Sequence, residues 1–315
     1  MRSRTPIAIT GLLLAATVSG QAPPLSPSPV VLPTERNVVF GNVGDAALLM
    51  DVYRPRSANG VAIIFISGSG WGGMPGYDHD YDDVLLKDDA LASAGYEGRI
   101  VQGLANRGYT VFAITHRFAP EVRSPQPIYD AQRAVRFVRA NAAKYGIDPT
   151  RLGAIGHSSG AHLAAMLGVI DTTIDNPRGI AAQSGSSKVQ AVVTLAAPFD
   201  VTDILYTSKV STRVLSNLFG GLPERGPDGA PLLTGSFADA SPITRVTANA
   251  APMLMYHAQN DSVILKRSAE RMDARLTELN VPHRLVMRSS GGHSVPYDLD
   301  EIESWLRTYL VERRR

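Results

Sequence analysis

A serine stands between two glycines in the stretch GHSSG, residues 156–160. The apolar run LGAIG, residues 152–156, leads into it, and the small-residue segment SGAHLAAMLGVI, residues 159–170, follows. A G-x-S-x-G sequence between a strand and a helix forms a sharp turn that raises the serine above the sheet, and the glycines let strand and helix approach closely. This context favours Ser158 as a nucleophile over a glycine-rich turn with an incidental serine.

A serine hydroxyl is a poor nucleophile by itself, so a base and an orienting acid must come from elsewhere in the chain. On folds that carry this turn, the order along the chain is serine, acid, histidine. Of the histidines well beyond Ser158, His257 lies inside the apolar segment MLMYHA, His283 begins HRLVMRS, and His293 falls in SSGGHSVPY. We predict His293 as the base, rather than a solvent-exposed loop histidine, because two glycines leave room for its ring to reach Ser158.

Two aspartates compete for the role of the acid. Asp261 lies in AQNDSVI, directly after MLMYHA, and Asp200 ends AAPFD after the preceding predicted strand. We predict Asp261 as the acid and expect Asp200 to cap the segment that follows it. Ser158, Asp261 and His293 then come from three separate loops after strands, in the expected order, and this agreement supports each of them.

Attack on an acyl carbon also needs donors for the negative charge that develops on the carbonyl oxygen. After the apolar run VAIIFIS comes SGSGWGG, residues 67–73, whose glycines would let backbone N–H groups turn toward the nucleophile. The N–H of Ser159 would complete such an oxyanion hole. A phosphate-binding loop is the competing interpretation, but the lysine and the spacing of that motif are absent.

Alternating strands and helices must position these loops. The sequence predicts an α/β fold with a mostly parallel central sheet and helices on both faces. Asp130 is placed to cap or open the helix predicted around it. Residues 201–250 are rich in Gly and Pro and are predicted as a small cap-like excursion over one edge of the sheet. The predicted strands are 37–42, 48–55, 61–67, 109–117, 152–156, 189–197, 251–258 and 283–289, and the predicted helices are 99–107, 128–146, 159–170, 265–280 and 299–315.

The amino-terminal residues have the order of an export signal. Arg2 and Arg4 precede an apolar stretch from Ile7 to Val18, and small residues follow. We predict a signal peptide over residues 1–22, a Pro-rich linker over 23–36 and one domain over 37–315. The expected protein is therefore secreted or periplasmic and bacterial. This apolar stretch is too short to span a bilayer, and no other segment approaches the length that a membrane helix needs, so the mature form is not expected in a membrane.

Charge and cysteine content exclude several partners and chemistries. The formal net charge is +2, and Arg2 and Arg4 account for it, so the rest of the chain has no basic excess to attract nucleic acid. The absence of cysteine excludes thiol catalysis and cysteine-ligated metals. The predicted chemistry needs no cofactor and no metal. The aspartates of residues 78–89 are spaced partly like those of a calcium loop, but Asp83 stands where that loop needs glycine, so a solvated acidic loop is expected.

Together these stretches resemble the α/β-hydrolase superfamily, and within it the exported bacterial esterases of the hormone-sensitive-lipase and feruloyl- and acetylxylan-esterase-like (BD-FAE-like) branch. The matching stretches are SGSGW, THRFAP, residues 129–165, ASPITRV, MLMYHAQNDSV and GGHSV. The resemblance implies the same nucleophile, acid and base as above. It also implies that the amides of Gly68, Ser69 and Ser159 form the oxyanion hole.

The sequence departs from this family in the oxyanion loop. Ser67 replaces the usual histidine, and Ser69 replaces a glycine. Amides survive such substitutions, but the support of the loop changes, so Gly70 and Trp71 stay open as alternative donors.

The resemblance implies a secreted serine carboxylesterase that cleaves short-chain acyl or aryl esters through an acyl-enzyme, with acetyl or feruloyl groups on polysaccharides among its candidate substrates. Two alternatives stay open. One is a serine peptidase or amidase on the same triad, and the other is a non-catalytic binding module on a hydrolase fold. A binding module has no need for all three triad residues, so their joint presence argues against it.

Overall fold

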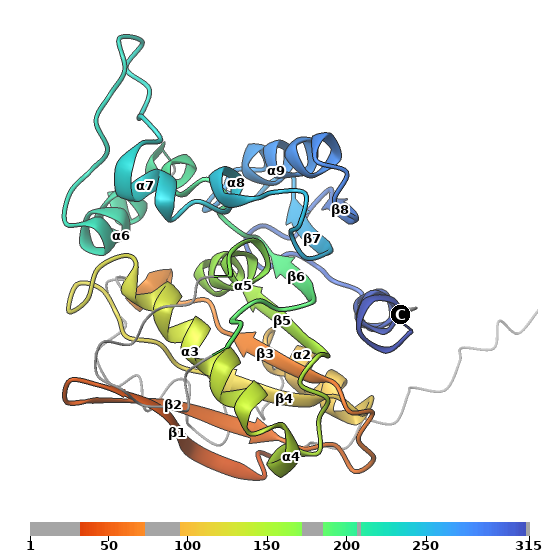
Figure 1. Ribbon diagram of the computed structural model, residues 1–315. Helices are drawn as coiled ribbons and strands as arrows, with labels where there is room; N and C mark the ends of the chain where they lie inside the picture. The colour runs from red at the N-terminus through yellow and green to blue at the C-terminus, as the bar shows by residue number, and fades with distance from the viewer. Residues whose placement is uncertain (1–31, 73–94, 172–184, 207–208, 313–315) are drawn as a thin grey trace, which may run out of the picture.

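The computed structural model describes residues 32–72, 95–171, 185–206 and 209–312 (Figure 1). The predicted signal peptide, most of the predicted linker and the acidic stretch at 78–89 lie outside these residues. The first strand begins at Glu35, ahead of the predicted domain start at Asn37. Thr34 already donates its backbone N–H to the carbonyl of Val52 at 2.7 Å, so the end of the predicted linker belongs to the sheet.

An eight-stranded sheet forms the centre of the molecule, and its strand order is β1-β2-β4-β3-β5-β6-β7-β8. β1 and β2 are antiparallel to their neighbours, and all the other neighbouring strands are parallel. Each strand coincides with a predicted one, and the mostly parallel sheet confirms the predicted fold class. In chain order the strands are β1 (Glu35–Val43), β2 (Ala46–Tyr53), β3 (Ala62–Ile66), β4 (Thr110–Ile114), β5 (Leu152–His157), β6 (Ala191–Leu195), β7 (Met253–Ala258) and β8 (His283–Arg288).

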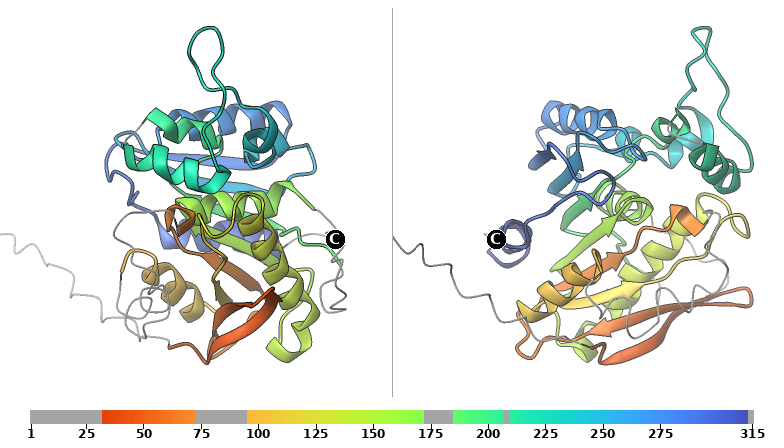
Figure 2. Two further views of the ribbon diagram at one scale, coloured as in Figure 1. Left: turned by 90° about the vertical axis from the view of Figure 1, so that its left-hand side faces the viewer. Right: turned by 180° about the vertical axis from the view of Figure 1, so that it is seen from behind.

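Helices cover both faces of the sheet because the parallel strands are apolar on both sides. In β3, Ile64 enters one core and Phe65 enters the other. The first core is completed mainly by α3 (Gln126–Ala140), α5 (Ser159–Val169) and α9 (Arg267–Glu278). The second is completed by α2 (Gly98–Asn106), α10 (Leu299–Leu306) and the π-helical turn η4 (Arg307–Val311) that continues α10 (Figures 1 and 2). The carboxyl ends of the parallel strands therefore meet at one edge, where ligands bind in such sheets.

The helix predicted over 128–146 is two helices in the structure. α3 starts before Asp130, with Pro127 in its first turn, and α4 (Ala142–Tyr145) follows separately. The prediction that Asp130 caps this helix is therefore wrong, because a proline suited to the first turn starts the helix earlier. Asp130 is instead fully buried and pairs at 2.9 Å with both Arg117 and Arg133, which joins α3 to the segment after β4.

The cap-like excursion predicted for residues 201–250 lies between β6 and β7. Phe219 and Phe237 stack within it at 4.1 Å between ring centroids, and the loop around the bridge between Arg225 and Pro231 extends away from the sheet (Figure 1). The elements of the excursion are the 3-10 helix η3 (Val201–Tyr206), α6 (Lys209–Phe219), α7 (Gly235–Asp239) and α8 (Pro242–Arg245).

Within the described ranges, no helix is both long and apolar enough to cross a membrane.

Candidate active site

Ser158 stands in a sharp turn between β5 and α5. Its φ is 54° and its ψ is −124°, a backbone conformation that residues other than glycine seldom adopt. The flanking glycines are required by close packing. A Cβ on Gly156 would lie 2.3 Å from the carbonyl oxygen of Gly160, and a Cβ on Gly160 would lie 2.1 Å from that of Ile66. The turn thus presents the Ser158 side chain at the carboxyl end of β5.

His293 lies in the loop between β8 and α10, and its ring reaches Ser158. Nε2 is 2.9 Å from Ser158 Oγ, and Nδ1 is 3.0 Å from Asp261 Oδ2. The loop is tied to the acid's own loop by Asn260, whose Oδ1 accepts the N–H of Gly292 at 3.0 Å. Because the carboxylate faces Nδ1, the neutral ring carries its proton there and offers Nε2 as an acceptor to the Ser158 hydroxyl. The structure therefore joins Ser158, His293 and Asp261 in one chain of hydrogen bonds.

Asp261 is held in the loop after β7 with its side chain fully buried. Its Oδ1 accepts the backbone N–H groups of Val263 at 2.8 Å and Ile264 at 2.9 Å. Burial acts to raise the pKa of Asp261, but the hydrogen bond and charge of His293 and the two amides outweigh it, so the pKa lies below its ordinary value. The group is a carboxylate at neutral pH and can stabilise a positive charge on His293.

The other two histidines considered from the sequence bind backbone carbonyls. His257 is buried in β7, and its Nε2 lies 2.9 Å from the carbonyl oxygen of Ile264. Burial lowers its pKa, so the ring is neutral and donates this hydrogen bond. His283 Nδ1 lies 2.7 Å from the carbonyl oxygen of Val281. Both rings are therefore engaged away from the nucleophile.

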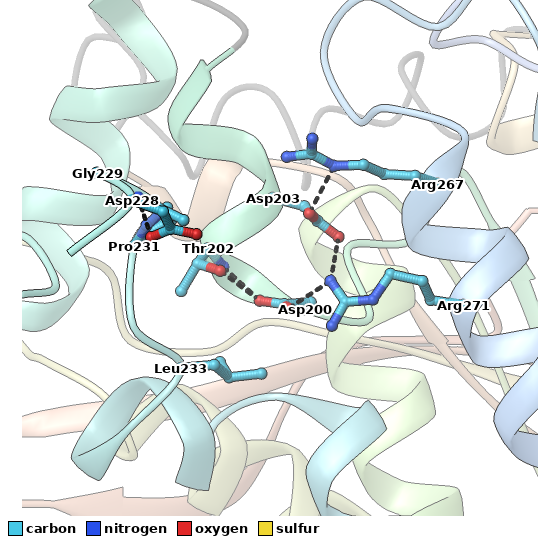
Figure 3. A pocket seen from close by; sticks show the side chains of 10 residues that line it. Asp200, Thr202, Asp203, Asp228, Gly229, Pro231, Leu233, Arg267 and Arg271 are labelled. Atoms are coloured by element: carbon cyan, nitrogen blue, oxygen red, sulfur yellow. Dashed lines mark hydrogen bonds and ion pairs between the residues drawn. The ribbon is translucent and has the colours of Figure 1, made fainter. Parts of the chain in front are cut away.

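The rival acid, Asp200, lies in a different polar cluster (Figure 3). Its Oδ1 accepts from the N–H and the hydroxyl of Thr202, and its Oδ2 accepts from Arg271 at 2.8 Å. Asp203 pairs with Arg267 at 2.8 Å, and the four charged side chains line a cavity of about 640 Å³ beside residues 228–231. Asp200 thus caps the start of the excursion, as expected, and joins η3 to α9.

The residues predicted to form the oxyanion hole lie close to the turn of the nucleophile, but two of their amides have partners. Gly68 N–H donates to Glu97 Oε1 at 3.0 Å, and Ser69 N–H donates to Ser159 Oγ at 2.9 Å. Ser159 is the first residue of α5, where an N–H has no acceptor within the helix. Gly68 packs so closely that a Cβ there would lie 3.0 Å from Ser158 Cβ. The loop packs against the turn of the nucleophile, and its role as an oxyanion hole and the choice of donors stay predictions.

Trp71, in the same loop, is fixed by a buried histidine. Its indole Nε1 donates to His162 Nδ1 at 3.2 Å, and His162 Nε2 donates to the carbonyl of Ala240 at 2.6 Å. Trp71 also has a positive φ of 55°, so its backbone is held in a conformation that it would seldom adopt freely. His162, in the first turns of α5, therefore connects the oxyanion loop to the excursion.

Replacing His162 with Gln should make the protein's stability less sensitive to acid. Burial lowers the pKa of His162 to about 4, whereas an unfolded chain protonates histidine near pH 6.5. The unfolded state therefore binds more protons between these values, so the free energy of unfolding falls as the pH falls. We expect the wild type to lose ~2 kcal/mol more than His162→Gln between pH 7 and pH 5.

Urea unfolding of both proteins at the two pH values measures this difference. Gln can accept from Trp71 and donate to Ala240, so the variant should fold. The other buried histidines contribute equally to both proteins and cancel in the comparison. Equal losses of stability on acidification would contradict the role given to His162.

Two residues beside Ser158 were not predicted from the sequence. Glu97 precedes α2, and His157 lies within the GHSSG motif itself. His157 Nδ1 is 2.8 Å from Glu97 Oε1, and His157 Nε2 is 3.0 Å from the carbonyl oxygen of His293. His157 could have been found from the sequence because it precedes the predicted nucleophile. Glu97 is far from the motif along the chain, and only the fold brings it to the site.

In the described ranges, no cluster of three His, Asp or Glu side chains could hold a metal ion.

Residues 50–276 match the BD-FAE family. The chain belongs to the BD-FAE family. This family consists of α/β-hydrolase esterases, as the sequence resemblance implied. The match includes Ser158 and Asp261, and His293 lies beyond its end.

Individual relatives of this BD-FAE chain agree with that assignment. Esterase LipC of Mycobacterium tuberculosis (strain ATCC 25618 / H37Rv) is 30% identical over 263 residues, which cover 82% of this chain and 57% of LipC. The chain spans about half the length of the curated relatives it matches.

Solved structures show the same α/β-hydrolase fold. A truncated carbohydrate esterase from gut microbiota aligns with a TM-score of 0.69 at 24% identity, and the alignment covers 90% of this chain and 98% of that one. An acetyl ester-xyloside bifunctional hydrolase from Caldicellulosiruptor lactoaceticus aligns with a TM-score of 0.62 at 20% identity, over 89% of this chain and 96% of that one.

Proposed function

We propose that this BD-FAE chain is a serine carboxylesterase that hydrolyses short-chain acyl or aryl esters through an acyl-enzyme. The observation that carries the proposal is the chain of hydrogen bonds from Asp261 through His293 to Ser158, with distances of 3.0 Å and 2.9 Å. A buried carboxylate, an imidazole and a half-buried turn serine joined in this order are what covalent acyl transfer requires.

In the first half of the reaction, His293 Nε2 takes the proton of Ser158 as Oγ attacks the ester carbonyl. The tetrahedral intermediate carries its negative charge on the former carbonyl oxygen, next to the first turn of α5 and the loop of Gly68 and Ser69. Asp261 stabilises the imidazolium that forms. His293 then gives the proton to the departing alkoxide, and an acyl-Ser158 ester remains.

In the second half, water replaces the alcohol. His293 takes a proton from the water as its oxygen attacks the acyl-enzyme, and returns that proton to Ser158 Oγ when the carboxylic acid leaves. The residues present are sufficient for each of these proton transfers.

The substrate class rests on the relatives and on the predicted export. A structural neighbour acts on acetyl esters and xylosides by its title, and another is a carbohydrate esterase. We include acetyl and feruloyl groups on polysaccharides among the proposed substrates on this basis. We also propose that residues 1–22 direct export, because two arginines, an apolar stretch and small residues follow one another there; the amino-terminal sequence of the protein recovered outside the cytoplasm tests this.

Hydrolysis of p-nitrophenyl esters of increasing acyl length, alongside acetylated xylan and the anilide of the best acyl group, tests the proposed reaction. We expect kcat/KM to be highest for the shortest acyl chains, and acetate to be released from xylan. Turnover of the anilide at a rate comparable to the ester would instead support the amidase alternative. No turnover of any of these substrates would support the binding-module alternative.

A further inference from the structure

We propose that Glu97 and His157 form a second acid–imidazole pair that positions the oxyanion loop and the base of the triad relative to each other. The inference rests on the proposed function, since it concerns how that triad is held. Within the part of the chain that the structure describes, neither residue forms a hydrogen bond with the Ser158 hydroxyl, so both are positioning residues. Their contacts reach both sides of Ser158.

On one side, the pair holds the loop of the predicted oxyanion hole. Glu97 Oε1 accepts the N–H of Gly68 at 3.0 Å and faces His157 Nδ1 at 2.8 Å. Gly68 has no room for a side chain here, because a Cβ would lie 2.8 Å from His157 Nδ1. The carboxylate therefore fixes the Gly68 peptide directly against the turn of the nucleophile.

On the other side, the pair holds the loop of the base. His157 Nε2 lies 3.0 Å from the carbonyl oxygen of His293, and the centroids of the two imidazole rings are 4.9 Å apart. Tyr96, next to Glu97, strengthens the same connection: its hydroxyl donates to the carbonyl of Val295 at 2.6 Å, and its own carbonyl accepts from Tyr297 at 3.1 Å. The residues directly before α2 thus hold the backbone of the loop that contains His293.

The partners of His157 define its protonation. A carboxylate oxygen and a carbonyl oxygen are acceptors only, so both ring nitrogens must carry protons to satisfy both contacts. An imidazolium next to a carboxylate is the consistent state of the pair. Burial opposes this charge, but the hydrogen bond and charge of Glu97, with the His293 carbonyl and the charge of Asp261, raise the pKa of His157 above its ordinary value.

The other groups that face His157 do not supply a competing charge. Tyr96 packs against it at 5.1 Å between ring centroids, and burial raises the pKa of Tyr96, so this ring stays neutral. His293 contributes its carbonyl and its ring, and Arg99 acts on Tyr96 and Tyr297. Glu97 and the triad's own Asp261 are thus the acidic side chains that act on His157.

Kinetics of Glu97→Ala, His157→Phe and the double variant test the pair. We expect each single variant to lower kcat about tenfold to a hundredfold with KM nearly unchanged, because a misplaced base slows the reaction more than it weakens binding. The double variant should be no worse than the worse single one, because the two residues act through each other. Glu97→Gln should keep most of the activity, since its amide can accept from Gly68 and still bond His157.

Formate gives a readout that a general loss of stability would not give. A small carboxylate can enter the space left in Glu97→Ala, so formate should raise kcat of this variant, whereas chloride at equal ionic strength should not. Glu278→Ala, an exposed glutamate on α9, is the matched control and should behave as wild type with or without formate. Losses that add in the double variant, a loss in KM alone, or equal responses to formate and chloride would overturn the proposal.

Nitrogen-15 NMR of histidine-labelled protein tests the pair without any turnover. Both ring nitrogens of His157 should carry protons at neutral pH in the wild type, and one should lose its proton in Glu97→Ala. A neutral His157 in the wild type would refute the pair even if the esterase is active. Conversely, an imidazolium at His157 in a protein without esterase activity would refute the proposed reaction and leave the pair in place.

Discussion

Ser158→Ala is expected to lower kcat for p-nitrophenyl acetate about 10⁶-fold, to the level of the uncatalysed and non-covalent background. Alanine has the same Cβ and can adopt the same turn, so the fold and the hydrogen bond between His293 and Asp261 should persist. The loss arises because no acyl-enzyme can form without Oγ. Steady-state hydrolysis of the wild type and the variant, purified separately to avoid carry-over, measures it.

Ser304→Ala is the matched control, because this serine is exposed on α10 and its side chain has no place in the proposed reaction. It should retain the activity of the wild type. Unfolding temperatures of all three proteins should agree closely. A Ser158→Ala protein that is folded and still hydrolyses the ester would show that another nucleophile does the chemistry.

Asp261→Asn is expected to lower kcat about 10⁴-fold with a small change in KM. The Asn oxygen can still accept from Val263 and Ile264, so the loop should keep its shape. The amide cannot stabilise a positive His293, and its N–H₂ group facing Nδ1 favours the wrong tautomer, with the proton on Nε2 where Ser158 needs an acceptor. Steady-state kinetics at several pH values above neutrality measure this loss.

The comparison with Asp200→Asn makes the second prediction specific. Asp200 follows the neighbouring strand and binds Thr202 and Arg271 rather than His293. Its variant should lose stability but keep kcat of the folded enzyme within several-fold. If Asp200→Asn lowered kcat more than Asp261→Asn does, the assignment of Asp261 as the acid of the triad would be wrong.

Much of the architecture could be predicted because local pattern and global fold agree. Strands buried on both faces, such as β3, appear as unbroken apolar runs, and the glycines of GHSSG mark a turn where strand and helix nearly touch. The chain order of Ser158, Asp261 and His293 could be read in the same way, since each follows a strand that ends at the same edge. Their roles in a reaction stay predictions that the two variants above test.

The remainder depends on contacts between segments far apart in the chain. Asp130 could be mistaken for a cap because its partner Arg117 is on another element, and only the tertiary structure brings them together. Glu97 is not part of a recognisable sequence motif, and its contacts to Gly68 and His157 form where α2 begins beside β3 and β5. Likewise, the engagement of the Gly68 and Ser69 amides depends on side chains that no local pattern reports.

The most direct test of the account is the intact mass of the protein after reaction with a p-nitrophenyl phosphonate. The phosphonate is attacked like an ester but cannot be hydrolysed from the serine readily. We predict one phosphonyl addition on the wild type, located on Ser158 by peptide mapping, with parallel loss of esterase activity and no addition on Ser158→Ala. Addition at another residue, or full esterase activity in a protein that gains no mass, would contradict the central claim that Ser158 is the nucleophile.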